Sequence, residues 1–452
     1  MTAPFLAWLR PLLVRMCLAF RDPRPRERAL HMAFGLLCGA MPKTITSSLV
    51  FNRHRGDWSA EYRLFSKSEW TCDDLFEPVL AEAVQRGGDG PVIAAIDDTL
   101  LPKTGRFTPG AFYARDPLSP PFHTNLILGQ RFLEVAVMVR ANEAKPFRAI
   151  PVSYQFAPPL KARARASQEE KDAVRELAKK HNMSTIGRAV VENLRARLDR
   201  VPGGRRRTLL LTGDGSFANR TFLRHLPERT TAVCRIRRDA KMRRVLPPGP
   251  RKGNRRYGDQ LPTPAELLAD PAIPLQQITM NTGYRTVTIE FKVIEQVCWP
   301  KVTGETPGTL ILVKPLTYRL RKGDKLLYRQ PCFLFAVGEP ASCEQLIQAY
   351  LARWEIEVGF RDQKNILGVG KAQVRNPNAV ARAPAFLAAA YGALLLASIA
   401  TLDDTRNGQF PPRQPWQKRP VYRPPTHDLV ELLARQLAEA KEDQPAPLAN
   451  AS

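Results

Sequence analysis

The chain has 452 residues, and its 68 Lys and Arg against 43 Asp and Glu give a formal net charge of +25 at pH 7. Hydrophobic residues make up 44% of the sequence and charged residues 25%, which is typical of globular proteins and excludes a wholly disordered chain. A small acidic metabolite rarely needs so positive a protein. The charge therefore favours a polyanionic partner such as nucleic acid, or an anionic membrane surface.

No segment has the pattern of a membrane anchor or an export signal. Arg10 and Arg15 interrupt the apolar stretch near the N-terminus, so it lacks the continuous apolar region of a secretory signal. Residues 385–400 are apolar but fewer than the ~20 needed to cross a bilayer, and we predict a buried core helix there. The seven cysteines include no CxxC pair, which predicts reduced thiols in a cytoplasmic protein, without a disulfide framework or a zinc site.

Residues 1–88 are predicted to form short helices separated by capping residues. The basic side chains of this region allow two interpretations, a helix-turn-helix region that binds DNA or a helical cap on the next domain. The overall charge favours DNA binding. The basic region comprises Arg53, His54, Arg55, Arg63 and Lys67.

Residues 89–237 have the pattern of an α/β unit. Residues 91–98 form an apolar run that ends in Asp97 and Asp98, as in a strand buried on both faces, and residues 207–214 repeat this pattern up to Asp214. A long polar helix over 167–200 begins with a capping-box pattern. Together with strands at 126–139, 148–156 and 230–237 and a helix at 219–226, the order predicts a mixed sheet with flanking helices.

The second half of the chain contains three segments with different residue patterns. Residues 238–337 open with two basic loops and continue as a β-rich insertion. Residues 338–402 are helical, with a first helix from Ser342, whose capping box includes Gln345, to Gly368, followed by the buried core helix. Residues 403–452 are predicted to form a Pro-rich linker and a short tail helix. We therefore divide the chain into five segments with these bounds.

Two strand-end acids and an acid on a later helix suggest a metal site. Carboxylates at the ends of buried strands need a cation, a metal or solvent around them. They supply the hard oxygen ligands that Mg²⁺ prefers. Two such ions about 3.5–4 Å apart activate a water or a 3′-hydroxyl and stabilise the leaving oxygen in phosphoryl transfer.

The helical acid belongs to a spaced set, Y-x2-R-x3-E-x6-K, which comprises Tyr350, Arg353, Glu357 and Lys364. At about 100° per residue all four fall within an arc of about 60°. One face would offer the carboxylate to a metal, with Arg353 and Lys364 beside DNA phosphates and Tyr350 as a hydrogen-bonding group. The alternative is a surface helix with an ordinary i,i+4 ion pair between Arg353 and Glu357.

With these motifs, residues from about 30 to 400 resemble the DDE transposases of bacterial insertion sequences, in the group with the tyrosine–arginine–glutamate–lysine signature. The matching segments are Ile96–Thr99, Thr212–Gly215 and the spaced set of the helix. The resemblance implies an RNase H-like α/β core of the retroviral-integrase superfamily, with a β-rich insertion and a helical N-terminal DNA-binding region. It also implies two Mg²⁺ ions, for which Mn²⁺ can substitute.

By this resemblance Asp98, Asp214 and Glu357 hold the metal ions and carry out catalysis. Successive strand residues point to opposite faces, so only one of Asp97 and Asp98 faces the metals if the strand continues through both. Family members place the ligand directly before Thr, which favours Asp98. Asp97 is then a neighbouring group, although a turn between the two would change this.

Several further side chains have two interpretations. Lys103 and Arg106 are either phosphate contacts or, more usually, solvated loop charges. A basic cluster over 235–256, in which we single out Arg237, Arg238 and Lys241, favours contact with the DNA backbone. Related transposases hold a flipped base with an aromatic residue, but we expect Trp299 to be a packing residue, and Trp354 to lie in the core.

The function predicted from sequence is therefore that of an insertion-sequence transposase. It would bind the terminal inverted repeats of its element, nick DNA and join the 3′-hydroxyl to target DNA, as a homodimer on double-stranded DNA and without a membrane. The alternatives are an inactive transposase-derived DNA-binding protein and an RNase H-like nuclease that does not join strands.

Overall fold

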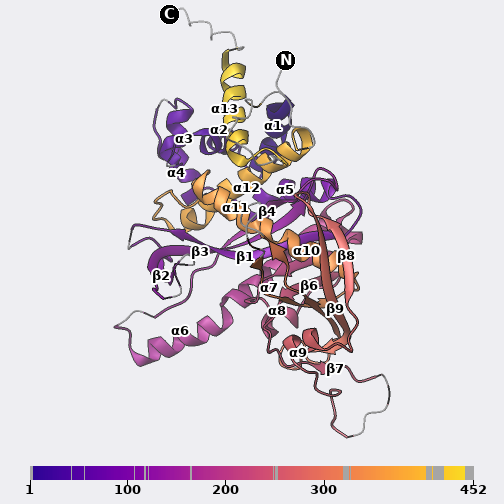
Figure 1. The fold of residues 1–452 in the computed structure, drawn as a ribbon. Helices are drawn as coiled ribbons and strands as arrows, with labels where there is room; N and C mark the ends of the chain where they lie inside the picture. The colour runs from indigo at the N-terminus through magenta and orange to yellow at the C-terminus, as the bar shows by residue number, and fades with distance from the viewer. Residues whose placement is uncertain are drawn as a thin grey trace, which may run out of the picture.

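A computed structural model describes residues 4–442 with internal gaps. The residues outside the description are 1–3, 42, 55, 106, 117–118, 121, 163–164, 248, 250–252, 319–324, 326, 404–409, 411–421 and 443–452. Arg55 and Arg106 of the sequence analysis lie among them. Figure 1 shows a central sheet with helices on both faces and a helical layer at the end that carries both termini.

The sheet is mixed and has eleven strands. Its order is β2-β3-β1-β5-β6-β13-β10-β9-β7, with β4 paired to β3 and β8 paired to β9. The central strand β1 is antiparallel to β3 and parallel to β5, which is parallel to β6. The strands are β1 (Val92–Pro102), β2 (Phe112–Arg115), β3 (Leu126–Val139), β4 (Arg148–Phe156), β5 (Leu209–Gly213), β6 (Thr230–Arg235), β7 (Arg243–Arg244), β8 (Gln276–Asn281), β9 (Thr286–Cys298), β10 (Gly308–Val313) and β13 (Cys332–Gly338).

The β-rich segment over 238–337 extends this sheet instead of forming a layer of its own. Its last strand, β13, pairs with β6 in antiparallel register, and β10 and β9 continue outward from β13. The run Leu310–Leu312 is buried on both faces of the sheet, which favours an internal strand. Only β11 (Thr317–Tyr318) and β12 (Leu327–Tyr328) form a separate pair among the described residues.

Helices cover the sheet on both faces. Ala94 and Ile96 of β1 belong to the large core on one face, and Ala95 belongs to a small cluster on the other. The first face carries α5 (Cys72–Arg86), α7 (Met183–Arg200) and α12 (Pro377–Thr401). The second carries α10 (Cys343–Ala352) and α11 (Trp354–Asn365). The predicted mixed sheet with flanking helices is thus confirmed.

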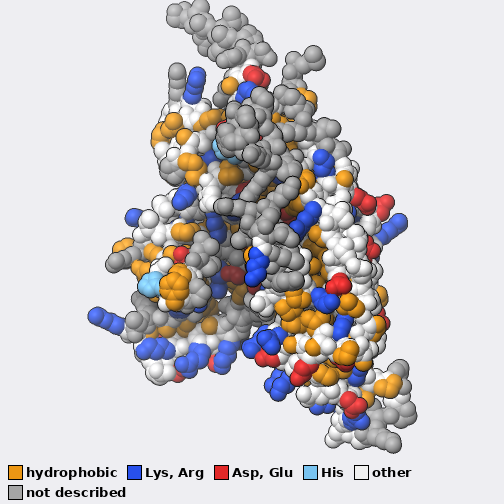
Figure 2. Space-filling model, in the orientation of Figure 1, with side chains coloured by type: hydrophobic (Ala, Val, Ile, Leu, Met, Phe, Trp, Pro, Cys, Tyr) orange, Lys and Arg blue, Asp and Glu red, His pale blue; other side chains and the backbone are white. Residues whose placement is uncertain are grey.

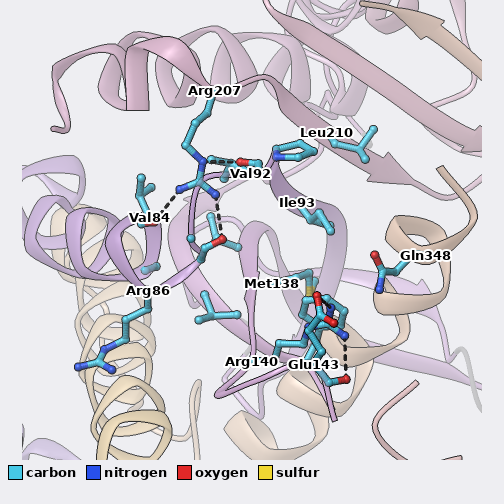
Figure 3. A pocket seen from close by; sticks show the side chains of 18 of the residues that line it. Val84, Arg86, Val92, Ile93, Met138, Arg140, Glu143, Arg207, Leu210 and Gln348 are labelled. Atoms are coloured by element: carbon cyan, nitrogen blue, oxygen red, sulfur yellow. Dashed lines mark hydrogen bonds and ion pairs between the residues drawn. The ribbon is translucent and has the colours of Figure 1, made fainter. Parts of the chain in front are cut away.

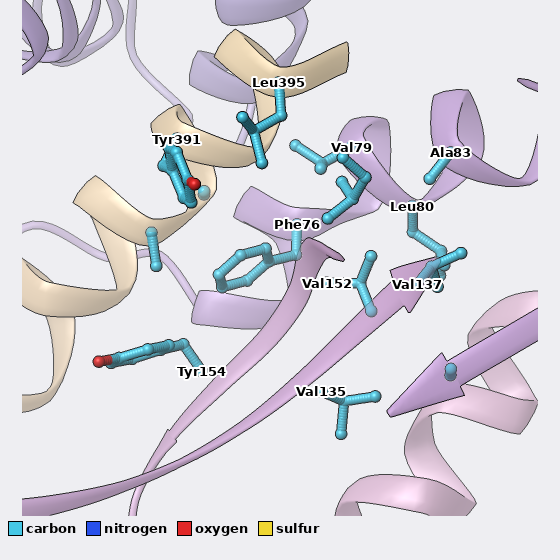
Figure 4. Packing of buried hydrophobic residues seen from close by; sticks show 14 of the residues in the cluster. Phe76, Val79, Leu80, Ala83, Val135, Val137, Val152, Tyr154, Tyr391 and Leu395 are labelled. Atoms are coloured by element: carbon cyan, nitrogen blue, oxygen red, sulfur yellow. The ribbon is translucent and has the colours of Figure 1, made fainter. Parts of the chain in front are cut away.

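Helix α12 is the core helix predicted near residues 385–400. It is long and apolar enough to cross a membrane by length and composition, but 94% of its most apolar window is buried inside the protein. Figure 4 shows the packing: Tyr391 and Leu395 of α12 face Phe76 and Val79 of α5 over the strands. Around α12 lie α1 (Pro4–Cys17), α2 (Pro23–Cys38), α4 (Ser59–Ser66) and α13 (Thr426–Glu442), and α3 (Ile45–Phe51) packs against α2.

Two predicted helices are interrupted in the structure. The helix expected over 167–200 is α6 (Gln168–Lys180) and α7, because Asn182 caps α7 by accepting hydrogen bonds from the backbone of Ser184 and Thr185. Asn and Ser favour such caps over helix interiors. The helix expected from Ser342 to Gly368 is α10 and α11, which meet at Arg353. The predicted capping boxes at Ser167 and Ser342 are both present. The helix expected over 219–226 is shorter, α8 (Arg220–Leu223).

Candidate active site

Two acids lie side by side where β1 and β5 run parallel. Ile96 of β1 is in register with Gly213, the last residue of β5, so Asp97 and Asp214 occupy the next position on each strand. A turn follows β5 at once. Within it, Asp214 accepts hydrogen bonds from the backbone N–H and the hydroxyl of Ser216, at 2.9 and 2.5 Å, which fix its carboxylate at the sheet edge.

The alternation of side chains along β1 decides which neighbouring aspartate faces the helix. The strand continues through both acids to Pro102. Ala95 packs with Ile356 and Phe360 of α11, and side chains two positions apart share a sheet face. Asp97 therefore lies on the face that α11 covers.

Arg353 joins the sheet acid to the helix acid. Its Nη1 donates to Oδ2 of Asp97 at 2.9 Å, and its Nη2 donates to Oε1 of Glu357 at 2.8 Å. Its side chain is 14% exposed, and its guanidinium lies 5.8 Å from the ring centroid of Tyr350. Because Arg353 is the junction of α10 and α11, one residue binds the strand acid while α11 presents Glu357 beside it. The i,i+4 ion pair is present, but it is half of a bridge to the sheet.

The electrostatics of these carboxyl groups reflect their burial. Burial raises the pKa of Asp97 to about 7; the charge of Asp214 adds to this, and the positive charge of Arg353 opposes it. The Asp98 side chain reaches solvent, but the protein around its carboxyl group still removes part of its hydration and raises its pKa; the charge of Asp214 adds to this, and the charges of Arg131 and Lys364 oppose it. Lys364 has a lowered pKa because it too is removed from solvent. A positive charge beside such a buried carboxyl group, here that of Arg353, favours its ionised form.

The sequence interpretation favoured Asp98 over Asp97 as the metal ligand, whereas in the structure it is Asp97 that is joined to the helix acid through Arg353. As the next residue of β1, Asp98 points its side chain to the opposite face of the sheet from Asp97. Its backbone N–H donates to Oδ1 of Asp97. The contact with Arg353, and through it with Glu357, belongs to Asp97. The sequence motif before Thr99 could not reveal this, because the choice depends on which sheet face receives α11.

A fourth acid lies beside this set and was missed by sequence reasoning. Glu134 of β3 is in register with Asp97 and fully buried. It accepts a hydrogen bond from Nε2 of Gln363 on α11 at 2.7 Å, and burial raises its pKa to about 8. The available signal was one acid in the otherwise apolar second half of β3.

Lys103 is neither a loop charge nor a phosphate contact. It is 6% exposed, and its Nζ donates to the backbone carbonyls of Gly370 and Ala372. These residues follow α11, so Lys103 ties the end of β1 to the segment that leaves the helix. Burial lowers the pKa of Lys103 to about 8.

An arginine-lined hollow adjoins Asp214. Gly215, Arg235, Arg237, Arg238 and Trp299 line it. The charged side chains of Arg237, Arg238 and Lys241 are exposed, and Arg237 pairs with Asp239. Figure 2 shows Lys and Arg side chains along α6 and over the lower part of the molecule.

The two tryptophans behave differently. Trp299 packs edge-on against Phe335, with ring centroids 6.0 Å apart, as expected of a packing residue. Trp354 was expected in the core, but it is 60% exposed. It follows Arg353, whose guanidinium points to the sheet, so the next side chain of α11 projects toward solvent.

A second pocket lies at the other end of β1, around Val92 and Ile93 (Figure 3). Arg207 projects into it but donates to the backbone carbonyls of Val84 and Gly90, so its guanidinium is held by the chain itself. At about 3.3 Å per residue, Ile93 lies about 13 Å from Asp97 along the strand. This pocket is therefore separate from the carboxylates.

The carboxylates have the donor chemistry of a site for hard divalent cations. Asp97, Asp214 and Glu357 would be the ligands. Within the described part of the chain, no three acidic, His or Cys side chains are close enough to share an ion. The guanidinium of Arg353 lies between Asp97 and Glu357, so the positive charge that an ion would supply is provided there by the protein. The oxygen ligands fit such a cation if the guanidinium moves aside.

Comparison with known proteins identifies the same region. Residues 16–291 match the family model described as the DDE superfamily endonucleases. The match includes β1 and β5 with Asp97 and Asp214, and it ends before α11. A search of the curated proteins gives no match.

Proposed function

Because the chain belongs to the DDE endonuclease superfamily, whose members generally use divalent metal ions, we propose that it is a DNA transposase of an insertion sequence. It binds the terminal inverted repeats of its element, nicks DNA with Mg²⁺ and joins the freed 3′-hydroxyl to target DNA. The mixed α/β fold is consistent with the RNase H-like core of such enzymes.

The observation that carries the proposal is the bridge that Arg353 forms between Asp97 of the sheet and Glu357 of α11. Asp97 and Asp214 directly follow Ile96 and Gly213, which are in register on the parallel strands β1 and β5. In place of Asp98, we propose Asp97 as the first acid of the triad, because it lies on the face of the sheet that carries Glu357. Asp98 then acts as a neighbouring group.

Bound divalent ions would activate the attacking water or 3′-hydroxyl and stabilise the leaving oxygen. The protein's own residues position the DNA. Arg353 and Lys364 lie on the carboxylate side of α11 and supply positive charge for the phosphates on either side of the scissile bond. The ring of Tyr350 lies 5.8 Å from the guanidinium of Arg353, and its hydroxyl is the hydrogen-bonding group that we assign to the DNA backbone on this face. Catalysis comes mainly from positioning and charge stabilisation.

The charge of the molecule supports a long double-stranded DNA ligand. The chain carries a net charge of +25, and exposed Arg238 and Lys241 lie next to the hollow at Asp214. Basic side chains near the catalytic edge can follow the phosphate backbone without reading its sequence. We expect a homodimer that brings two element ends together in the cytoplasm, on the nucleoid.

The test uses the purified protein and a supercoiled plasmid that carries the inverted repeats flanking its reading frame. Nicked plasmid and strand-transfer product in Mg²⁺ or Mn²⁺, both lost with EDTA or in Asp214→Asn, are expected. DNA binding without cleavage would contradict the enzymatic function and indicate a transposase-derived binding protein. Nicking without any joined product would indicate a nuclease instead.

A further inference from the structure

Helix α11 is held on the face opposite Glu357 by the chain segment that leads into α13 and includes its first residue, Thr426. Glu355 and Asp362 of α11 are both buried, at 6% and 7% exposure. They are seven residues apart, so at about 100° per residue they lie within about 20° of each other on the helix. Glu357 and Lys364 point about 180–200° away from Glu355, toward the carboxylate site. One face of α11 carries the chemistry, and the opposite face carries two buried acids.

Residues 422–426 bind both buried acids. Nη2 of Arg423 donates to Oε2 of Glu355 at 2.5 Å, and the hydroxyl of Thr426 donates to Oδ2 of Asp362 at 2.7 Å. The side chains of Arg423 and Glu355 are 12% and 7% exposed, so solvent screens this ion pair little. The segment therefore runs along the back of α11 and contacts it at both ends.

The same segment is fixed to elements other than α11. Nη1 of Arg423 donates to the backbone carbonyl of Phe147, next to β4. Tyr284, on the turn between β8 and β9, contacts both the helix and the segment, and its hydroxyl donates to the second oxygen of Glu355 at 2.8 Å. The rings of Tyr284 and Tyr422 meet edge to face at 5.5 Å. Arg148 of β4 donates to the carbonyl of Pro424 at 2.8 Å. Because the sheet anchors the segment, its two bonds to α11 fix the helix relative to the sheet.

We propose that residues 422–426 form a strap that positions α11, with Arg423 and Thr426 as positioning residues for the Arg353–Glu357 pair over Asp97. The interior of α11 meets the sheet through small or flexible side chains, Ala95, Ala136, Met138 and Ala149. On the carboxylate side, Arg353 and Gln363 bind Asp97 and Glu134 of the sheet. The strap holds the opposite face of α11 through two further polar bonds, so rotation of the helix about its axis is restrained from both sides. This inference rests on the proposed function for its catalytic consequence, but not for its structural one.

The first arm of the test is amide hydrogen exchange of the full-length protein, which requires no activity. Arg423→Met and Thr426→Val are compared with Arg382→Met, a matched loss of a half-buried arginine that binds the carbonyls of Phe65, Ser68 and Trp70. We expect the amides of residues 354–365 to exchange at least about tenfold faster in the two strap variants and not in the control. Unchanged exchange, or the same increase in Arg382→Met, would overturn the strap.

The second arm measures plasmid cleavage. A strap predicts that kcat falls about tenfold and that the Mg²⁺ concentration for half-maximal rate rises in Thr426→Val, while the Kd for DNA stays within twofold. Thr426→Ser retains the hydroxyl and restores both quantities. A loss of thermal stability without a change in kcat would reduce the segment to an ordinary structural element. Should Arg423→Met not fold, Thr426→Val, which removes only one hydroxyl, decides. If the wild-type protein cleaves no DNA, the proposed function is wrong. The hydrogen-exchange measurement then still tests whether residues 422–426 hold α11 in place.

Discussion

Asp97 on β1 and Glu357 on α11 bind the same guanidinium group, that of Arg353. The guanidinium and Asp97 are largely buried, whereas the side chain of Glu357 is 35% exposed. Removal of the guanidinium therefore leaves Asp97 in particular without its partner. The bridge thus holds two proposed metal ligands near each other by means of a protein cation.

Replacement of that cation tests the arrangement. Arg353→Met should lower the free energy of unfolding by about 1–3 kcal/mol in EDTA. Mg²⁺ or Mn²⁺ should restore part of this loss, because an ion that binds only the folded state stabilises it. Urea denaturation with and without the cation measures both effects.

The matched control is Arg188→Met on α7, which breaks another i,i+4 pair, with Glu192, that is well exposed. Its effect should stay within about 0.5 kcal/mol and should not depend on the cation. If divalent cations stabilise Arg353→Met no more than they stabilise the wild type, then Arg353 does not occupy the place of a metal charge.

The choice between the adjacent aspartates gives a second prediction. Asp97→Asn should lower the rate of plasmid nicking on the order of 10²–10³-fold, because Asp97 shares the face of the sheet with Glu357. Asp98→Asn should stay within about tenfold of the wild type. Each variant removes one negative charge from neighbouring residues, so each serves as the other's control, and DNA binding by both should be retained. A severe loss in Asp98→Asn with an active Asp97→Asn would restore the assignment made from sequence.

Local patterns sufficed for part of the fold. Three local patterns can each be recognised within about a dozen residues. They are the apolar run before Asp97, the second run before Asp214 and the spaced set around Glu357. The core helix α12 follows from its composition in the same way. The mixed sheet with flanking helices could therefore be predicted from the order of such segments.

Contacts between segments that are far apart in the sequence could not be predicted in this way. Which face of β1 lies next to Glu357 depends on where α11 packs on the sheet. A shift of one residue along β1 would place Asp98 on that face instead of Asp97. Glu134 lies beside Asp97 only because β3 is in that register with β1. Lys103 was expected as a loop charge, and Arg423 lies in the predicted Pro-rich linker. Both are buried because they bind carbonyl or carboxylate partners from segments far along the chain.

The buried acid Glu134 gives a prediction about pH. Burial raises the pKa of Glu134 in the folded protein to about 8, against 4.5 for a glutamate side chain in water. The folded state therefore retains a proton that the unfolded chain loses, so the contribution to stability is complete at low pH and is lost as pH rises toward about 8. One proton corresponds to a slope of at most about 1.4 kcal/mol per pH unit.

Glu134→Gln should remove this slope and keep a hydrogen-bonding group opposite Gln363. The difference in unfolding free energy between wild type and variant, measured by urea denaturation from pH 5 to 8, should thus change steadily with pH in favour of the variant. The Asp97 carboxyl is present in both proteins and largely cancels. An equal slope in the two proteins would show that Glu134 is ionised in the folded state. Glu192→Gln, at an exposed position on α7, should leave the slope unchanged.

The last prediction concerns the basic edge beside Asp214. If Arg238 and Lys241 contact DNA phosphates, their joint replacement by Gln should weaken binding to any sequence. It should also reduce the slope of log Kd against log salt concentration by about 0.9 for each lost contact. Fluorescence anisotropy between 50 and 300 mM salt, with a duplex that carries the inverted repeat and one that does not, measures both. The control with equal charge is Arg205→Gln with Arg206→Gln, in the exposed turn that precedes β5 at the opposite end of that strand. A reduced slope in the control alone would place the DNA at the other end of the sheet, away from the carboxylates. That result would contradict the proposed path of the phosphate backbone.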